Sequence, residues 1–287
     1  MNGKKVLVTG ASGMLGSNLI ITLNYKNVIG YGSEFDITNS SLVYEKLNEI
    51  KPDIIIHTAA FTNVEECEVD IDKAYLINSI GTQNIVNYCI NKDILFIYIS
   101  STGIYGTNKS DEYTEFDKVE PTSIHHKSKY VAERNIQNHL HKYLILRTGW
   151  LYGGTKTHAK NFVYKRYLEA HNNDLIYSDD SQIGNPTFVG DLVKQIEVLI
   201  NTNQYGVFNC VNEATQVTRY EYVKRIIELF EVNCKVQIAS YNLFKRAAPV
   251  SQNESATNYK LNLLNLNTMG HWEISLEKYI NQLSNEI

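Results

Sequence analysis

The segment PTSIHHKSKYVAE, residues 121–133, places an imidazole and an ammonium group where they could act together on a substrate. His125 and Lys129 are four residues apart, so on a helix their side chains lie on one face, one turn from each other. An unperturbed imidazolium has a pKa of about 6.5, and a neighbouring ammonium lowers that pKa because like charges disfavour the protonated form. The neutral ring could still donate an N–H hydrogen bond to a carbonyl oxygen, but it would be a poor source of a whole proton at neutral pH.

A second segment, GASGMLG at residues 10–16, has the pattern of a dinucleotide-binding loop. It follows an apolar run typical of a strand and opens a helical pattern. Gly10 would allow the tight turn, Gly13 would let the backbone approach a pyrophosphate at the helix N-terminus, and Gly16 would allow close packing of helix on sheet. The loop therefore predicts cofactor binding through Gly10, Ser12, Gly13, Met14, Leu15 and Gly16.

The segment FDITN, after the second expected strand, bears on the choice of cofactor. Asp36 in this segment is a candidate neighbour of adenine, and a place in a helix N-cap region is the alternative. No Arg or Lys stands between Tyr31 and Asp36. Because a 2′-phosphate usually requires a nearby guanidinium, the sequence slightly favours NAD(H) over NADP(H).

The elements that must position these residues alternate along the first half of the chain. Apolar runs at 4–9, 28–32, 53–60, 94–101 and 143–153 read as strands, and the segments between them include helical patterns at 13–24, 40–50, 72–92 and 128–140. This alternation predicts an α/β fold with a Rossmann-like, doubly wound parallel sheet over residues 1–150. After Trp150 the pattern is less regular. We expect a smaller, mixed α/β substrate domain over 151–287, with segments near 188–212 returning to the first domain.

Composition excludes several classes of function. The chain has 287 residues, 43% hydrophobic and 20% charged, with a formal net charge of -4, so we expect no nucleic-acid or membrane partner. The N-terminus lacks the apolar region of a signal peptide and no apolar run reaches the roughly 18 residues of a membrane span, which predicts a cytoplasmic protein. The four cysteines, at 67, 89, 210 and 234, form no CxxC pair, and we expect no metal site.

Five further segments occur in a characteristic order: HTAAFTNVEECE (57–68), SSTGIYG (100–106), RTGWLYG (147–153), NFV (161–163) and DSQIGNPT (180–187). Together they resemble the dTDP-4-dehydrorhamnose reductase family, a branch of the extended short-chain dehydrogenase/reductases. The resemblance implies a nucleotide-sugar substrate, an NAD(P)H cofactor, and reduction of a 4-keto group on a 6-deoxyhexose. It also implies a homodimer, through the helices near 70–92 and 128–140.

The resemblance further implies roles for individual residues. Ser101 matches the active-site Ser or Thr of the family, with Thr102 as a less favoured substitute, and Lys129 matches the lysine that holds the nicotinamide ribose. Other positions match cofactor-side or substrate-side segments: Ala59, Ala60, Asn161 and Gln182. Asn78, in the long helix, is a candidate cofactor-side residue. Arg246 is displaced from the Arg-Pro that the family tends to carry, because the chain reads KRAAPV there. For Asn78 a place on the helix surface is the alternative. For Arg246, a candidate for binding a diphosphate, the alternative is an ordinary surface arginine.

Position 125 departs from the family, which has a tyrosine there and usually a glycine at position 126. That tyrosine protonates the alkoxide formed as hydride arrives. His125 could be a weakened acid, a polarising group with water delivering the proton, or a solvated residue of an inactive site. We therefore expect an NAD(P)-dependent oxidoreductase, and keep two alternatives: a binding or regulatory protein of the same fold, and a related extended short-chain epimerase or reductase.

Overall fold

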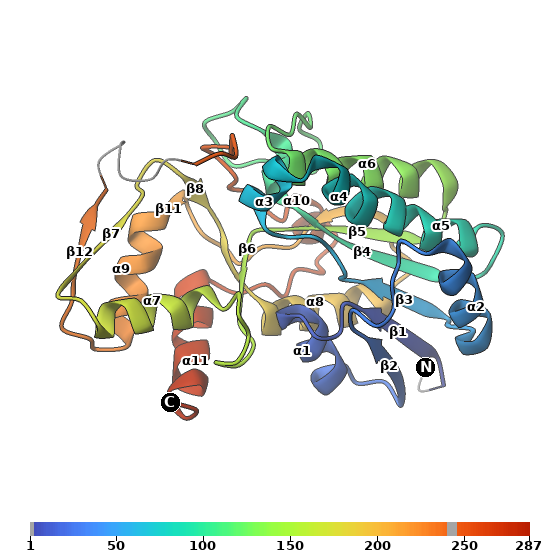
Figure 1. Cartoon of the computed structure of the whole chain (residues 1–287), viewed down its shortest axis with the longest axis horizontal. Helices are drawn as coiled ribbons and strands as arrows, with labels where there is room; N and C mark the ends of the chain where they lie inside the picture. The colour runs from blue at the N-terminus through green and yellow to red at the C-terminus, as the bar shows by residue number, and fades with distance from the viewer. Residues whose placement is uncertain (1–2, 240–245) are drawn as a thin grey trace.

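Six parallel strands form the central sheet of the computed structural model, which describes residues 3–239 and 246–287 (Figure 1). Their order across the sheet is β10-β5-β4-β3-β1-β2. The strands are β1 Lys5–Thr9, β2 Asn27–Tyr31, β3 Ile54–His57, β4 Leu95–Ser101, β5 Tyr143–Thr148 and β10 Gly206–Asn209. Nearly all residues of the inner strands β1, β3 and β4 are buried, because helices cover both faces of the sheet. Apolar runs rich in β-branched side chains therefore form these strands.

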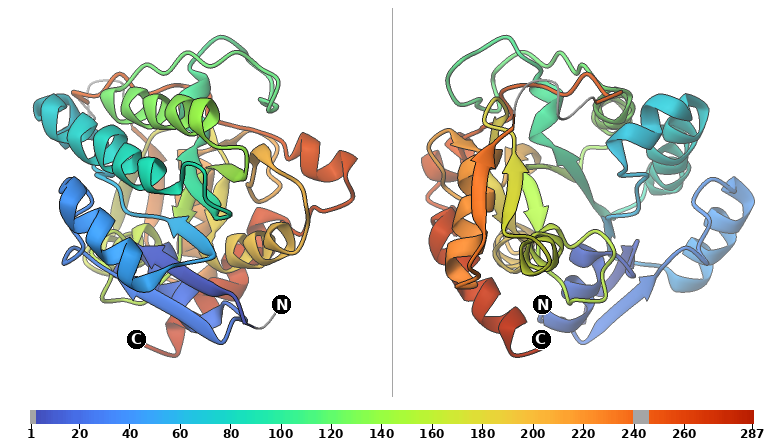
Figure 2. Two further views of the ribbon diagram at one scale, coloured as in Figure 1. Left: turned by 90° about the vertical axis from the view of Figure 1, so that its right-hand side faces the viewer. Right: turned by 60° about the vertical axis from the view of Figure 1, so that its left-hand side comes forward.

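Helices cover both faces of this sheet, as expected for a doubly wound fold. Helices α2 (Ser40–Ile50), α5 (Thr82–Cys89) and α6 (Ile124–His139) pack on one face, and α1 (Met14–Thr22) and α8 (Val189–Ile200) on the other. The green helix α6 and the yellow helix α8 lie on opposite sides of the sheet in Figure 2, left. Successive β1 residues alternate between the two cores, so Val6 and Val8 pack with α1 and α8, and Leu7 packs with α2.

The long helix predicted over 72–92 is interrupted. The chain forms α3 (Val64–Val69), α4 (Ile71–Tyr75), a π-helical segment η1 (Leu76–Gly81) and then α5. Asn78, in η1, is buried: its Oδ1 accepts from the Phe61 N–H at 2.8 Å, and its Nδ2 donates to Oγ of Ser128 at 3.0 Å. The π segment therefore ties the chain after β3 to helix α6.

A smaller lobe follows Thr148 and lies at the left of Figure 1. Its helices are α7 (Phe162–His171), α9 (Arg219–Leu229) and α11 (Trp272–Ser284), and β7 (Leu175–Ser178) pairs with β12 (Lys235–Ile238). Buried Tyr152 stacks against Phe188 at the centre of this lobe. The remaining short elements are η2 Thr102–Tyr105, β6 Trp150–Tyr152, β8 Ile183–Gly184, β9 Pro186–Phe188, β11 Val217–Thr218 and α10 Tyr259–Leu263.

The chain returns to the large sheet through α8 and β10, which lie in the region 188–212. Strand β10 pairs with β5, from Gly206 opposite Leu144 to Asn209 opposite Arg147. The domain limits at 150 and 151 stay a prediction. Among the residues that the structure describes, no helix has the length and apolar character needed to cross a membrane.

Candidate active site

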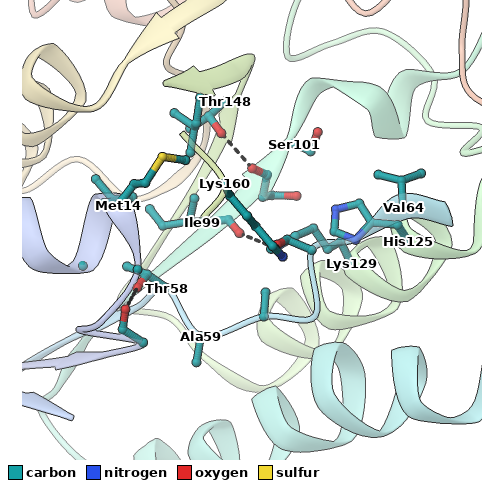
Figure 3. Close-up of a pocket in the computed structure, with 18 of the residues that line it drawn as sticks. Met14, Thr58, Ala59, Val64, Ile99, Ser101, His125, Lys129, Thr148 and Lys160 are labelled. Carbon is teal, nitrogen blue, oxygen red and sulfur yellow. Dashed lines mark hydrogen bonds between the residues drawn. The ribbon is translucent and has the colours of Figure 1, made fainter. Parts of the chain in front are cut away.

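A cavity of about 800 Å³ lies at the carboxyl ends of β1, β3, β4 and β5, where the smaller lobe closes over the sheet. Figure 3 shows Ser101, His125, Lys129 and Lys160 around this cavity. Most residues predicted from the sequence line it: Gly10, Ser12, Gly13, Met14, Leu15, Gly16, Asp36, Ala59, Ala60, Ser101, His125, Lys129, Gln182 and Arg246. Parallel α/β sheets bind ligands at this edge.

Three predicted residues lie outside the cavity lining, and each has an intramolecular partner. Asn78 is buried against Phe61 and Ser128, so its alternative place on a helix surface is wrong. Thr102 is buried, and its hydroxyl donates to the Thr148 carbonyl at 3.4 Å. Asn161 caps α7 and its Nδ2 donates to the Tyr279 hydroxyl at 2.6 Å. The structure therefore does not bring Asn78, Thr102 and Asn161 to the cavity.

The glycine loop has the geometry that a pyrophosphate requires. Gly10 has a φ of +69°, and a Cβ on it would lie 2.6 Å from the Ala59 nitrogen. A Cβ on Gly16 would lie 2.2 Å from the Gly10 carbonyl oxygen, whereas one on Gly13 would meet only that oxygen, at 3.3 Å. Helix α1 starts beside Gly13 with no side-chain cap, so the helix N-terminus is available to an anion.

Asp36 lines the cavity and is part of a local turn. Its Oδ1 accepts from the backbone N–H of Thr38 at 2.9 Å and from the Thr38 hydroxyl at 2.7 Å. The N-cap of α2 is Asn39, three residues later, whose Oδ1 accepts from Leu42. Asp36 therefore belongs to the turn that precedes the cap.

Lys129 is buried, and its ammonium group is held by the strand beneath it. Nζ donates to the Ile99 carbonyl at 2.8 Å and lies 4.9 Å from the centre of the Tyr98 ring. Burial lowers the pKa of Lys129 to about 8, against the opposing effect of the Glu133 carboxylate. The group is thus mostly charged at neutral pH and faces an environment with little water.

His125 is buried, so the alternative of a solvated residue at the helix start is wrong. Helix α6 begins at Ile124, capped by Ser123, four residues before the predicted start. Nδ1 of His125 lies 3.0 Å from the Phe61 carbonyl oxygen, which can only accept, so Nδ1 carries the hydrogen. Burial lowers the pKa of His125 well below its usual value, and His126 and Lys129 lower it further. The predicted direction is confirmed, but burial, rather than Lys129, is its main cause.

The neighbouring histidine makes the contact with the active-site serine. Nε2 of His126 lies 3.3 Å from Oγ of Ser101, and Nδ1 lies 3.0 Å from Oγ of Ser123. Burial lowers the pKa of His126, while the Glu254 carboxylate raises it. From the sequence alone, position 126 is unusual only because the family usually has a glycine there. The signal that could have identified its role is Gly103, because a ring at position 126 requires space there.

Comparison with known proteins decides the family. Residues 4–285 match the family model described as RmlD substrate binding domain. The chain belongs to this family. A dTDP-4-dehydrorhamnose reductase from Aggregatibacter actinomycetemcomitans is 32% identical over 234 residues, 78% of each chain. The resemblance to dTDP-4-dehydrorhamnose reductases that the sequence predicts is thereby confirmed.

Solved structures agree with this assignment. A crystal structure of a dTDP-4-dehydrorhamnose reductase from Clostridium acetobutylicum has a TM-score of 0.92 and 32% identity, over 98% of this chain and 99% of that chain. The enzyme of that name from Bacillus anthracis, in complex with NADP, has the same score and identity, over 97% and 99%. A Thermus thermophilus UDP-glucose 4-epimerase complex with NAD is 19% identical with a TM-score of 0.83, which shows the fold alone.

In this member of the RmlD family, the lobe side of the cavity carries residues that the sequence analysis did not assign. The Arg219 guanidinium lies 3.5 Å above the Trp150 ring, and its Nε donates to Oε1 of Gln182 at 3.3 Å. Nη1 of Arg246 lies 3.3 Å from the same oxygen. Trp150 also lines the cavity. No spacing signals Arg219, because it comes from a helix 37 residues beyond Gln182.

A second ammonium group reaches the cavity from the loop before α7. Nζ of Lys160 donates to the hydroxyl of Thr62, and Lys160 lines the cavity (Figure 3). Two glycines at 153 and 154 with positive φ shape the turn that starts this loop.

In the described ranges 3–239 and 246–287, no group of three or more His, Cys, Asp or Glu side chains is placed to hold a metal ion.

Proposed function

We propose that this chain is an NAD(P)H-dependent oxidoreductase that reduces the 4-keto group of a nucleotide-linked 6-deoxy sugar, with a dTDP-4-dehydrorhamnose-type sugar as the leading substrate. The observation that carries the proposal is the convergence on one cavity of the glycine loop, Ser101 with Lys129, and the pair Arg219 and Arg246. Each of these groups matches one part of such a reaction: cofactor, reacting carbonyl and diphosphate. Relatives with the corresponding names support the assignment.

The residues present fit a nicotinamide dinucleotide. The glycine loop leaves open the space beside Gly13 at an uncapped helix N-terminus, which suits a pyrophosphate. The segment Gly32–Thr38 lines the adenine-side end with an acidic Asp36 and without Lys or Arg. We therefore propose NADH as the preferred cofactor, because a 2′-phosphate there would meet no guanidinium or ammonium group.

The chain's own residues can stabilise the negative charge that develops on the keto oxygen. When bound, the nicotinamide supplies a hydride to the carbonyl carbon, and the carbonyl oxygen takes up one proton. Ser101 is placed to donate a hydrogen bond to that oxygen, and the buried ammonium of Lys129 lowers the energy of the charge nearby. His125 keeps its N–H on the Phe61 carbonyl, so the proton comes from water in the cavity.

Two arginines on the lobe side suit the diphosphate of the substrate. Arg219 and Arg246 converge on Oε1 of Gln182, and both line the cavity. A diphosphate is bound well by guanidinium groups, which donate paired N–H bonds to its oxygens. The side chain of Gln182 holds the two guanidinium groups together in the free protein.

We also propose a homodimer. Apolar side chains are exposed on α3, α4, η1 and α6, the region in which the sequence predicts the contact: Val69, Ile71, Leu76, Ile80 and Val131. Exposed apolar residues grouped on neighbouring elements favour burial against a partner. The cytoplasmic location stays a prediction.

The proposal is tested by measuring the binding of NADH and NADPH and then the oxidation of each cofactor with dTDP-4-keto-6-deoxy sugar. We expect tighter binding of NADH and turnover that Lys129→Met reduces strongly. A chain that binds both cofactors but oxidises neither would instead be a binding protein of this fold. The engagement of the His125 N–H with Phe61 is the observation that favours this second candidate.

A further inference from the structure

We infer that the imidazole of His126, rather than that of His125, orients the hydroxyl of Ser101 so that its hydrogen points at the keto oxygen of the substrate. The inference rests on the proposed function and deepens it. It makes His126 a positioning residue, which acts through Ser101 and does not itself contact the reacting atoms.

The hydrogen-bond partners of Ser101 leave its own hydrogen free. Oγ of Ser101 accepts from the backbone N–H of Gly103 at 3.2 Å and lies 3.3 Å from Nε2 of His126. A hydroxyl oxygen has two acceptor lone pairs and one donor hydrogen. If Nε2 also donates, both lone pairs are used, and the O–H hydrogen can only point away from Gly103 and His126. Ser101 lines the cavity, so that remaining direction leads into it.

The helix cap favours one tautomer of His126. Oγ of Ser123 accepts from the backbone N–H of His126 as the N-cap of α6. In the described part of the chain, Nδ1 of His126, 3.0 Å away, is the acceptor within reach of the hydroxyl hydrogen of buried Ser123, and leaving that hydrogen unpaired would cost free energy. A ring nitrogen that accepts a hydrogen bond carries no hydrogen in the neutral ring, so the hydrogen of His126 is on Nε2, the atom facing Ser101.

Space for this ring is provided by Gly103 in η2, the short helix that follows β4. A Cβ at position 103 would lie 2.2 Å from Cε1 and 2.3 Å from Nε2 of His126, so only glycine allows the ring to reach Ser101. The ring of His125 is 5.1 Å from that of His126 and is held by the Phe61 carbonyl. His125 therefore cannot take over the contact without losing its own hydrogen bond.

The charged and titratable groups facing His126 keep this ring a donor of a hydrogen bond rather than of a proton. They are Lys129 and His125 on its own helix, Glu254 on the chain before α10 and Glu68 on α3. Burial and Lys129 lower the pKa of His126, and the two carboxylates oppose them. Because the net shift is downward, the ring is neutral at neutral pH, and kcat should not depend on its protonation there.

Four variants test the inference in the dTDP-4-keto sugar assay. Ser101→Ala should lower kcat by about 100-fold or more, the usual loss for one donor to a developing oxyanion. His126→Leu should lower kcat by roughly 10-fold to 100-fold with KM for NADH unchanged, and His126→Gln, whose amide can replace the Nε2 donor, should retain kcat within about threefold. Ser101→Ala/His126→Leu should be no slower than Ser101→Ala alone, because His126 acts only through Ser101.

Two kinetic results would overturn the inference. A His126→Leu variant as active as the native chain, or a double variant clearly slower than Ser101→Ala, would show that His126 does not act through Ser101. Nitrogen NMR of labelled histidine rings provides a readout that does not depend on turnover. We expect the Nε2–H tautomer for His126 and the Nδ1–H tautomer for His125. A native chain without turnover would contradict the proposed function, whereas an Nδ1–H tautomer at His126 would contradict this inference.

Discussion

The ammonium group of Lys129 has lost nearly all its contact with water, and its expected titration follows from that. Its pKa is lowered to about 8 because the charged form is desolvated. Between pH 7 and pH 9 the group therefore loses its charge, and with it the stabilisation of the developing alkoxide. We predict that kcat falls as pH rises through about 8, in a pH profile measured with saturating substrate.

The matched control lies on the same helix. Lys127 is exposed, so Lys127→Met should keep both kcat and the alkaline limb, whereas Lys129→Met should lower kcat by about 100-fold and remove the limb. Persistence of the limb in Lys129→Met would assign it to another group. The same shift affects folding. Since the folded pKa of Lys129 lies below the unfolded value, its burial destabilises the fold below about pH 8, and this effect disappears as pH rises towards 10.5.

For the two histidines, some features could be predicted from the sequence and others could not. The spacing of His125 and Lys129 on one helix was predictable, and so was the direction of the pKa shift, because both depend on helix geometry and charge. The bond from Nδ1 to the Phe61 carbonyl was not predictable, because Phe61 is 64 residues away along the chain. The contact between His126 and Ser101 depends in the same way on tertiary packing.

At the scale of elements, two glycines of the loop have different roles. Gly16 allows the helix to pack on the sheet, and Gly13 borders the space for the cofactor. A methyl group on Gly16 would overlap the Gly10 carbonyl, whereas one on Gly13 would meet only the edge of the empty space at the helix N-terminus. We predict that Gly16→Ala lowers the free energy of unfolding by about 2 kcal/mol, as for an overpacked core. Gly13→Ala should leave stability within about 0.5 kcal/mol but weaken NADH binding by at least about tenfold.

Urea unfolding and NADH titration distinguish the two variants, each of which is the control for the other. Equal losses of unfolding free energy in Gly13→Ala and Gly16→Ala would mean that both glycines contribute to helix packing in the same way. Equal losses of NADH affinity with full stability in both would mean that Gly16, too, borders the cofactor directly.

The helix predicted over 72–92 could be recognised from the sequence, but its interruption could not. Its apolar periodicity correctly indicated helical structure, but the π-helical segment Leu76–Gly81 adds one residue to a turn without a distinctive sequence signal. Its consequence is visible only in three dimensions: buried Asn78 reaches both Phe61 and Ser128. The true start of α6 could have been predicted, because Ser123 is a favourable N-cap residue.

For the whole molecule, the large sheet was predictable and the cavity wall opposite it was not. Continuous apolar runs such as DIIIH determine buried parallel strands almost by themselves. The smaller lobe depends on strands of two or three residues, such as β8 and β11, which carry too little periodicity. The meeting of Arg219, Gln182 and Arg246 follows from the packing of that lobe, and of the three residues only Gln182 stands in a local motif, DSQIGNPT.

The arginine pair yields a prediction about substrate binding. We expect Arg219→Ala and Arg246→Ala each to raise KM for the nucleotide sugar by roughly tenfold, because each removes a charge-assisted contact to the diphosphate. The dissociation constant for NADH should not change. Arg225→Ala, on the same helix as Arg219 but paired with Glu228, is the control and should leave both constants within about twofold. A free sugar without diphosphate should lose its dependence on Arg219 and Arg246, and a dependence that persists would place another part of the substrate there.

The exposed apolar residues on α3, η1 and α6 yield a prediction about assembly. Val69 is 83% exposed, Ile80 51% and Val131 39%, although all three are aliphatic. In a two-fold symmetric dimer each substitution occurs in both subunits, so a charge placed at this surface would be buried twice.

We predict a dimeric mass for the native chain by light scattering after gel filtration. Ile80→Asp should raise the dimer dissociation constant by about 100-fold or more. Ile21→Asp is the matched control, since Ile21 is 81% exposed on α1, away from these helices. A monomeric native chain, or an equal effect of the two substitutions, would exclude this surface as the dimer contact.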